Sequence, residues 1–366
     1  MIRVLHNIGT LANGGMESFI MNLYRHIDRS EVQFDFVVGH KTDWCQSYAD
    51  EISSMGGRVF CLDESKSSVQ QFGRILQENS DYRIVHSHRD AMSAFFLREA
   101  KKCHIPVRIS HSHSASETGW FKKIATRLLV PMLNHYATLR LACGEEAGLH
   151  LYGKKRFMVF PNSIDLKKYK YNSHVALDKR IEIGVEKDAL LIGHVGRFFP
   201  QKNHFFLIDV FSEVYKRNNH ARLLLVGAGN LKPQVKKKVE DLGLADAVIF
   251  LENRTDVDEL LQAMDIVLFP SLYEGFSMAM VEMQASGLRI LSSDRVPNEI
   301  NVTGSVTFKS LNESASSWAD QLLQLSQYDR NSINADLLVE AGLDVQANAH
   351  RLQDMYIELH DSINKH

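Results

Sequence analysis

Strand-like and helix-like segments alternate along nearly the whole chain, in two separate blocks. In the first block, seven short apolar runs have the length and composition of buried strands: 2–6, 34–38, 58–62, 84–87, 107–111, 139–142 and 157–160. Amphipathic stretches at 16–26, 69–79 and 91–102 lie between several of them and predict helices. Strands that alternate with helices indicate a parallel sheet with helices on both faces.

The alternation stops after Pro161-Asn162, in a polar stretch rich in lysine and tyrosine that we interpret as a linker extending to about residue 172. It restarts with strand-like runs at 190–196, 222–226, 248–251, 266–269, 289–292 and 306–308. Helices are predicted at 203–216, 232–242, 257–263, 277–286, 314–325 and 345–362. The sequence therefore predicts two α/β domains, residues 1–165 and 166–344, followed by a C-terminal helix within 345–366.

Length and composition agree with two domains. A chain of 366 residues is too long for one ordinary core. Its formal net charge of -2 gives no reason to expect a nucleic-acid partner. The four cysteines show no metal-binding spacing, and because the first residues lead directly into a strand pattern, we expect no signal peptide. We expect a cytoplasmic protein.

Ligands of open α/β sheets bind outside the carboxyl ends of the strands, and with two such domains we expect the site in the cleft between them. Gly14 and Gly15 follow the first strand and open a helix, which would allow close approach of a phosphate. The motif lacks the GxGxxG spacing of dinucleotide-binding folds, so a flexible loop is an equal alternative.

The loop after the first strand of the second domain carries two cations. Arg197 directly follows Gly196 at the carboxyl end of that strand. Lys202 lies within six positions of the same glycine, and Asn203 comes next. Two positive charges there suit a diphosphate whose leaving charge they would stabilise. The competing interpretation is a solvated loop with incidental charges.

Two further loops fall on the same predicted sheet edge. Gly227 follows the next strand, and Arg254 follows the one after it. They could form the floor beneath a nucleotide base, or they could be ordinary connections, and the sequence favours neither.

Two glutamates follow the strand at 266–269. Glu274 lies in a glycine-marked loop, and Glu282 lies two turns inside the next predicted helix. The N-terminus of that helix offers free N–H groups to an anion. We interpret the glutamates as contacts to a ligand with polar groups at two depths, in preference to an acid/base couple.

The Asp256-Val257-Asp258 segment matches the DxD metal signature of another transferase class. Asp256 precedes an apolar-periodic helix, where an acidic residue is a natural cap. We interpret it as structural and expect no metal there.

Four histidines lie at the carboxyl ends of two predicted strands of the first domain, in His86-Ser87-His88 and His111-Ser112-His113. Zinc is one interpretation. Strand alternation sends His111 and His113 to one face, but no acidic or cysteine partner follows at a defined spacing. A polar role in the cleft for at least one of them is favoured.

The segment from Trp120 to Leu129 is aromatic, apolar and basic, with Lys122, Lys123 and Arg127. Such a helix could rest on an anionic membrane surface. The favoured alternative is an amphipathic helix packed on the first domain.

Together and in this order, the motifs resemble those of retaining GT-B glycosyltransferases of family 4, of the type that assembles bacterial polysaccharides. The resemblance covers essentially the whole chain. The motifs that carry it are Glu274 and Glu282 in a Pro-Ser-x-x-Glu-Gly-Phe setting, Gly196-Arg197 with Lys202-Asn203, Gly14-Gly15, and the hinge-like Pro161-Asn162-Ser163-Ile164-Asp165.

The resemblance implies a GT-B fold: two Rossmann-like domains facing across a cleft, with the last helix returning to the first domain. It implies that the second domain holds a nucleotide-sugar donor, most commonly a UDP-sugar, and that the acceptor is a glycan or a polyprenyl-linked glycan. The implied reaction moves a hexosyl residue with retention at the anomeric carbon and needs no metal or other cofactor.

By the same resemblance, Arg197 and Lys202 contact the diphosphate, Glu282 contacts the ribose, and Glu274 contacts the sugar. A histidine of the first domain approaches the sugar, and the sequence leaves His111 and His113 as alternatives. We add Gly227 and Arg254 to the donor-binding candidates because of the position of their loops. The full set of donor-binding candidates is Gly14, Gly15, Asn203, Gly227, Arg254, Gly275, Phe276, Ser277 and Glu282.

Three alternatives remain. The chain could be a catalytically lapsed partner subunit, although Arg197, Lys202, Glu274 and Glu282 are all present. It could act on a small-molecule acceptor. A nicotinamide-dependent dehydrogenase is disfavoured because GxGxxG is missing.

Overall fold

The computed structural model describes the chain except residues 10, 12–14, 40–42, 114–119, 253 and 364–366, and except the side chains of residues 15, 43–47, 120–123 and 125. The chain divides into two compact units. Unit 1 contains Met1–Ser163 and Gly342–His366, and unit 2 contains Ile164–Ala341. Among the described residues, none of the helices combines the length and apolarity needed to span a bilayer.

Unit 1 is built on a seven-stranded parallel sheet in the order β3-β2-β1-β4-β5-β6-β7. Its strands are β1 (Ile2–Asn7), β2 (Val32–Val38), β3 (Val59–Cys61), β4 (Ile84–Ser87), β5 (Val107–Ser112), β6 (Leu139–Ala142) and β7 (Met158–Val159). Its helices are α1 (Gly15–His26), α2 (Asp43–Ser54), α3 (Ser68–Glu78), η1 (Asp90–Met92), α4 (Ser93–Lys102), α5 (Trp120–Tyr136), α6 (Glu145–Tyr152) and α15 (Val345–Ile363).

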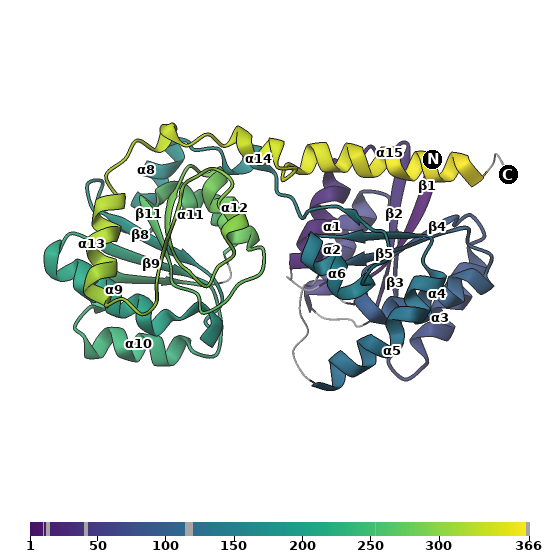
Figure 1. The fold of residues 1–366 in the computed structure, drawn as a ribbon. Helices are drawn as coiled ribbons and strands as arrows, with labels where there is room; N and C mark the ends of the chain where they lie inside the picture. Colours follow the sequence, from purple (N-terminus) through teal and green to yellow (C-terminus); the bar gives the residue numbers. More distant parts are fainter. Residues whose placement is uncertain (10, 12–14, 40–42, 114–119, 253, 364–366) are drawn as a thin grey trace. The chain divides into compact units, whose positions relative to one another are not determined.

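Both faces of this sheet are buried, as the continuous apolar strands predict. Val4 packs in a core with residues of α1, α2 and α15, whereas the next residue, Leu5, packs in the opposite core with residues of α3 to α6. The C-terminal α15 runs beside α1 and contacts β1 and β2 (Figure 1). It buries Leu352 and Tyr356 there, so the last helix completes one face of unit 1.

Unit 2 has a six-stranded parallel sheet in the order β10-β9-β8-β11-β12-β13. Its strands are β8 (Leu191–Val195), β9 (Arg222–Val226), β10 (Val248–Leu251), β11 (Ile266–Phe269), β12 (Arg289–Ser293) and β13 (Val306–Lys309). Its helices are α7 (Leu166–Tyr169), α8 (Ser173–Glu182), η2 (Pro200–Lys202), α9 (His204–Arg217), α10 (Lys232–Asp241), η3 (Ala245–Ala247), α11 (Val257–Ala263), α12 (Met278–Ala285), η4 (Asn298–Ile300), α13 (Ala315–Leu325), η5 (Arg330–Ser332) and α14 (Asp336–Glu340).

The thirteen strand-like runs predicted from sequence all form strands, with ends that differ by a few residues. The predicted α/β class with two doubly wound parallel sheets is therefore confirmed. The predicted linker is wrong in extent. Chain contacts divide the units between Ser163 and Ile164, and α7 forms within the stretch read as linker because Asp165 caps it by accepting from the Lys167 N–H at 3.1 Å.

Each sheet has one point at which the order of its strands reverses. In unit 1 it lies between β1 and β4, and in unit 2 between β8 and β11. Crossovers leave such a point in opposite directions, so the loops after its two strands diverge and leave room for a ligand. These two positions are where chemistry is expected in each unit.

Candidate functional site

The candidate site of unit 2 is formed by the loops that follow β8 and β11, the two strands at the reversal point. The first loop carries Arg197 and Lys202 and ends in η2, and the second carries Glu274 and leads into α12. A backbone hydrogen bond from Leu272 N to Gln201 O, 2.8 Å long, joins the two loops. Residues more than 70 positions apart thus share one sheet edge.

Lys202 and Glu274 form a direct ion pair. Lys202 Nζ lies 2.5 Å from Glu274 Oε1, and the two side chains are 15% and 7% exposed. Gln201 Nε2 donates to the second carboxylate oxygen of Glu274 at 3.2 Å and to Tyr273 O at 3.0 Å. The lysine nitrogen also lies 4.7 Å from the centre of the Phe269 ring. Cation and carboxylate are therefore held where a ligand with polar groups could exchange partners with them.

Arg197 is exposed at the start of the same loop. Its guanidinium lies 5.0 Å from the centre of the Phe199 ring. Asn203, predicted to bind the ligand, links η2 to α9 with a left-handed backbone (φ 53°). Asparagine tolerates this conformation better than most residues.

The loop after β9 packs backbone to backbone against the loop after β8. Phe198 N donates to Ala228 O at 2.9 Å. A Cβ on Gly227 would lie 2.2 Å from Gly196 O, and φ is 150° at that position. A glycine is thus needed at position 227 because the backbone of Gly196 lies too close for a side chain. This structural role is compatible with its predicted place beneath a ligand, and the geometry does not by itself indicate ligand contact.

The N-terminus of α12 lies next to the ion pair in sequence. Gly275, Phe276 and Ser277 precede Met278, the first residue of the helix, and Ser277 is its N-cap with no side-chain capping bond. The first N–H groups of a helix have no acceptor within it. Because Gly275 and Phe276 are exposed, this end can receive an anion or a hydroxyl oxygen.

Glu282 lies inside α12, where its side chain is partly buried and its carboxyl group is hydrogen-bonded to Tyr169 of α7. Burial raises the pKa of Glu282 to about 7, although the Tyr169 hydrogen bond and the Lys168 ammonium oppose this shift. Burial and the neighbouring Glu282 together raise the pKa of the Tyr169 phenol. A carboxyl group can accept a hydrogen bond from a ligand hydroxyl when ionised, and can also donate one when protonated.

Arg254 is engaged in an ion network. Its guanidinium pairs with Asp256 and with Glu182, and Lys179 pairs with the same two acids, each at 2.7 Å. The Arg254 guanidinium, followed by Lys179, holds the pKa of Asp256 well below its usual range. The Arg254 side chain is therefore already bound to two carboxylates of the protein.

Both aspartates of the DxD-like segment have cationic partners. Asp256 pairs with Arg254 and Lys179, and Asp258 Oδ1 lies 3.1 Å from Lys168 Nζ. Asp256 is also the N-cap residue of α11, although its side chain makes no capping hydrogen bond. This arrangement agrees with the structural role inferred from sequence.

In unit 1, the histidines gather at the end of β1, β4 and β5. The rings of His111 and His113 have centroids 4.2 Å apart and are tilted by 30°, and His113 Nε2 lies 2.8 Å from His88 Nδ1. His88 Nε2 in turn lies 3.1 Å from His6 Nδ1. His111 is buried, whereas His113 is partly exposed, so His113 is the better placed of the two to meet a ligand. Of the glycines predicted here, Gly15 begins α1 and Gly14 lies outside the described residues.

Sequence reasoning missed three residues of these sites: Gln201, Tyr169 and His6. Gln201 lies beside Lys202 in the same motif, and its position was the only available signal. Tyr169 fell in the stretch interpreted as linker. His6 is directly paired with His86 across β1 and β4, and this pairing depends on strand order, which the sequence does not specify.

The comparisons with known proteins agree with one another. A family model described as "Glycosyl transferases group 1" matches residues 189–328. The Bacillus subtilis (strain 168) protein EpsF, whose name describes it as a glycosyltransferase, is 35% identical over 370 residues, covering 97% of this chain and 96% of EpsF. An Escherichia coli protein named UDP-Gal:alpha-D-GlcNAc-diphosphoundecaprenol alpha-1,3-galactosyltransferase is 25% identical, covering 64% and 63% of the two chains.

Among solved structures, Anabaena HepE in complex with UDP-glucose has a TM-score of 0.77 to this chain. The match covers 98% of this chain and 100% of that one at 18% sequence identity. At that identity the likeness concerns the fold.

Proposed function

The chain belongs to the GT-B glycosyltransferases, and we propose that it is a retaining member of family 4 that moves a hexosyl residue from a UDP-sugar to a glycan or lipid-linked acceptor in polysaccharide assembly. The observation that carries the proposal is the Lys202–Glu274 pair beside Arg197 and the N-terminus of α12. These groups offer cations for a diphosphate and a carboxylate for sugar hydroxyls at one sheet edge.

The donor part of the proposal rests on charge and on two similar proteins. In the absence of ligand, Lys202 and Glu274 satisfy each other. A bound UDP-sugar would give Lys202 and Arg197 phosphate oxygens, and would give Glu274 and Glu282 hydroxyl donors on the sugar and the ribose. HepE is described as binding UDP-glucose, and the Escherichia coli protein is named for a UDP-sugar donor.

The proposed reaction breaks the bond between the anomeric carbon and the diphosphate oxygen and forms a bond from that carbon to the acceptor oxygen on the same face. The departing phosphate oxygen takes the acceptor's proton. Arg197 and Lys202 stabilise the negative charge that grows on the leaving group, which is worth on the order of 3 kcal/mol for one such group. His113 is the proposed contact to the sugar from unit 1. No metal ion takes part in this scheme.

The acceptor part rests on the name of the Escherichia coli protein, which contains a diphosphoundecaprenol acceptor. The basic segment that could meet a membrane begins at Trp120, and its side chains at 120–123 lie outside the described residues. In the described part of that helix, Ile124 and Leu128 are exposed. Sedimentation with phosphatidylcholine vesicles, with and without phosphatidylglycerol, tests this contact, and equal binding to both would reject an anionic-surface role.

A panel of UDP-, GDP-, ADP- and dTDP-sugars tests the function. Isothermal titration should identify a UDP-sugar, and proton NMR of the product should show the anomeric configuration of the donor retained. Lys202→Ala should lower transfer about 10²–10³-fold, whereas Lys237→Ala, a highly exposed lysine of the same unit, should not. Absence of binding to every donor, or an inverted product, would contradict the proposal.

A further inference from the structure

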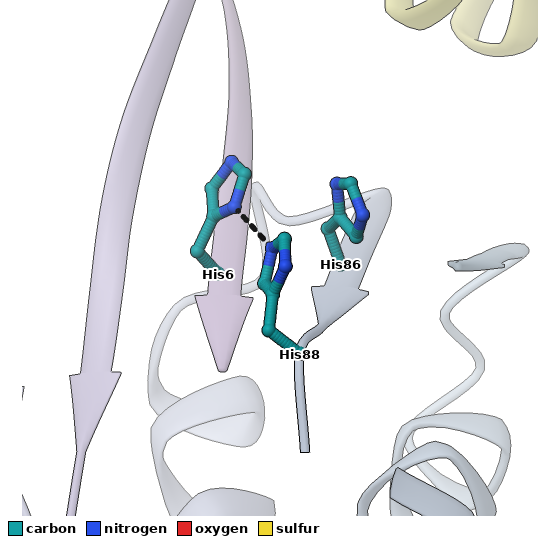
Figure 2. Close-up of side chains that lie close together, drawn as sticks. All are labelled: His6, His86 and His88. Carbon is teal, nitrogen blue, oxygen red and sulfur yellow. Dashed lines mark hydrogen bonds between the residues drawn. The ribbon is translucent and has the colours of Figure 1, made fainter. Parts of the chain in front are cut away.

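We propose that His6, His86 and His88 form a binding site for one zinc-class divalent transition-metal ion inside unit 1. His6 and His86 lie near the carboxyl ends of β1 and β4, at the reversal point of the sheet, and His88 directly follows β4. Figure 2 shows the three rings next to one another. One nitrogen from each lies within 4.8 Å of the others. The site is distinct from the groups proposed to bind the diphosphate and requires no sugar nucleotide.

The spacing of two of the nitrogens already suits a metal. His6 Nδ1 and His88 Nε2 are 3.1 Å apart. Imidazole nitrogens that bind zinc at about 2.0–2.1 Å in a tetrahedral arrangement are roughly 3.3 Å from each other. The third ring, His86, stacks on His88 with centroids 4.2 Å apart, and it would have to shift to bring its Nε2 to the ion.

In two of these rings, the nitrogen that would not bind the ion contacts another side chain. His88 Nδ1 lies 2.8 Å from His113 Nε2, and His86 Nδ1 lies 2.6 Å from Tyr356 Oη of α15. When these Nδ1 atoms carry the protons and donate them, each ring presents its Nε2 lone pair to the ion. Metal-binding histidines almost always have such a partner on the far nitrogen, because it fixes the tautomer and the ring orientation.

Several nitrogens of the cluster have no partner within the described protein. They include His6 Nε2 and His86 Nε2 and both ring nitrogens of His111. The small void lined by His6, His86, His88 and His111 has no room for a water molecule. Unpartnered buried polar atoms cost about 1–3 kcal/mol each, and an ion held by the triad would give one of these atoms, His86 Nε2, a partner.

The donor atoms of the triad are all imidazole nitrogens, and the three side chains are buried. Neutral imidazole suits zinc, copper, nickel and iron, and disfavours magnesium and calcium, which select oxygen ligands.

A second triad, His88, His111 and His113, meets the same distance limit. We assign the ion to the first triad because all three of its residues are buried and because Tyr356 orients His86. An ion there would fasten β1 to β4 and, through Tyr356, to α15. Metal binding should therefore stabilise the attachment of the last helix.

The test uses the full chain purified without metal-affinity chromatography. Elemental analysis should find roughly one zinc-class ion per chain. After removal of metal by a chelator, Co²⁺ should restore saturable binding with the visible absorption of a low-coordinate cobalt site, and Zn²⁺ should displace it. Both ions should raise the melting temperature of unit 1.

Variants locate the site. His86→Phe should abolish Co²⁺ binding, and Tyr356→Phe should weaken it about 10–100-fold. His174→Gln, an exposed histidine of unit 2, is the control and should leave it unchanged. If the wild-type chain holds no metal and gives neither a Co²⁺ spectrum nor a thermal shift, the proposal is wrong. Equal loss in the control, or binding that survives His86→Phe, also overturns it. The wild-type measurements decide even where a variant fails to fold.

Discussion

Replacing Lys202 by methionine should expose how the candidate donor site is held before any ligand arrives. Methionine keeps an unbranched stem against Phe269 and removes the ammonium. Glu274, only 7% exposed, then loses the partner 2.5 Å away and keeps the amide of Gln201. Breaking a buried ion pair from one side costs 3–5 kcal/mol in general. With one hydrogen bond remaining, we expect unit 2 to lose about 2–3 kcal/mol of unfolding free energy.

The measurement needs a signal from unit 2 alone. Trp318 is fully buried in its core, and the chain's other two tryptophans, Trp44 and Trp120, belong to unit 1. In a background with those two changed to phenylalanine, fluorescence during urea unfolding reports on unit 2. Lys216→Met, which removes the cation of a surface pair with Glu213, is the matched control and should leave the transition in place.

A double-mutant cycle separates the pair from its surroundings. Glu274→Gln keeps the shape and the contact to Gln201, and in the Lys202→Met background it should cost much less than alone. The expected coupling is about 1–3 kcal/mol. Additive effects, within about 0.5 kcal/mol, would refute the reasoning, because they would mean that Lys202 and Glu274 are bound to solvent and not to each other.

Other predictions follow from burial and backbone geometry. Because the pKa of Glu282 is raised to about 7, the folded protein binds a proton at this residue more tightly than the unfolded chain does. The unfolding free energy of unit 2 should therefore fall by about 2–3 kcal/mol as pH rises from about 4.5 to 7. Glu282→Gln should remove this contribution to the pH dependence. Burial lowers the pKa values of the clustered histidines, so acid should destabilise metal-free unit 1. Its unfolding free energy should fall by about 1 kcal/mol per buried histidine for each pH unit below 6.5, and His88→Gln should make this dependence on pH shallower. Gly227→Ala should cost more than about 2 kcal/mol in thermal unfolding, whereas Gly243→Ala, with φ 68° and no atom within 4 Å of a new Cβ, should cost about 1. Equal losses in the two glycine variants would show that the close approach to Gly196 is not what constrains the loop.

Much of the fold could be predicted from the sequence because its signals are local. Buried parallel strands are continuous apolar runs, so segments such as 222–226 and 266–269 were found with the bounds that the structure gives. Helices were less complete. No helix was predicted at 43–54, 145–152 or 173–182, and the apolar period is weak in the last two of these segments. The short α7 lay within the supposed linker.

The candidate site was predictable where a motif places a charge directly after a strand. Arg197, Lys202 and Glu274 follow β8 and β11, so each could be assigned to a sheet edge from its neighbours alone. Their partners were not predictable in the same way. Gln201 and Tyr169 have no distinctive pattern, and they matter because of what lies opposite them.

The sequence by itself determined the two α/β blocks, the order of their strands along the chain and the residues that follow each strand. Only the tertiary structure decided which of those strands are neighbours. The pairing of β8 with β11 brings Lys202 onto Glu274, and the pairing of β1 with β4 brings His6 beside His86. Apolar periodicity indicates which residues are buried, because apolar side chains are excluded from solvent. It does not indicate which strand or residue each of them packs against. Partner choice comes from crossover direction and packing, which involve residues far apart in the chain.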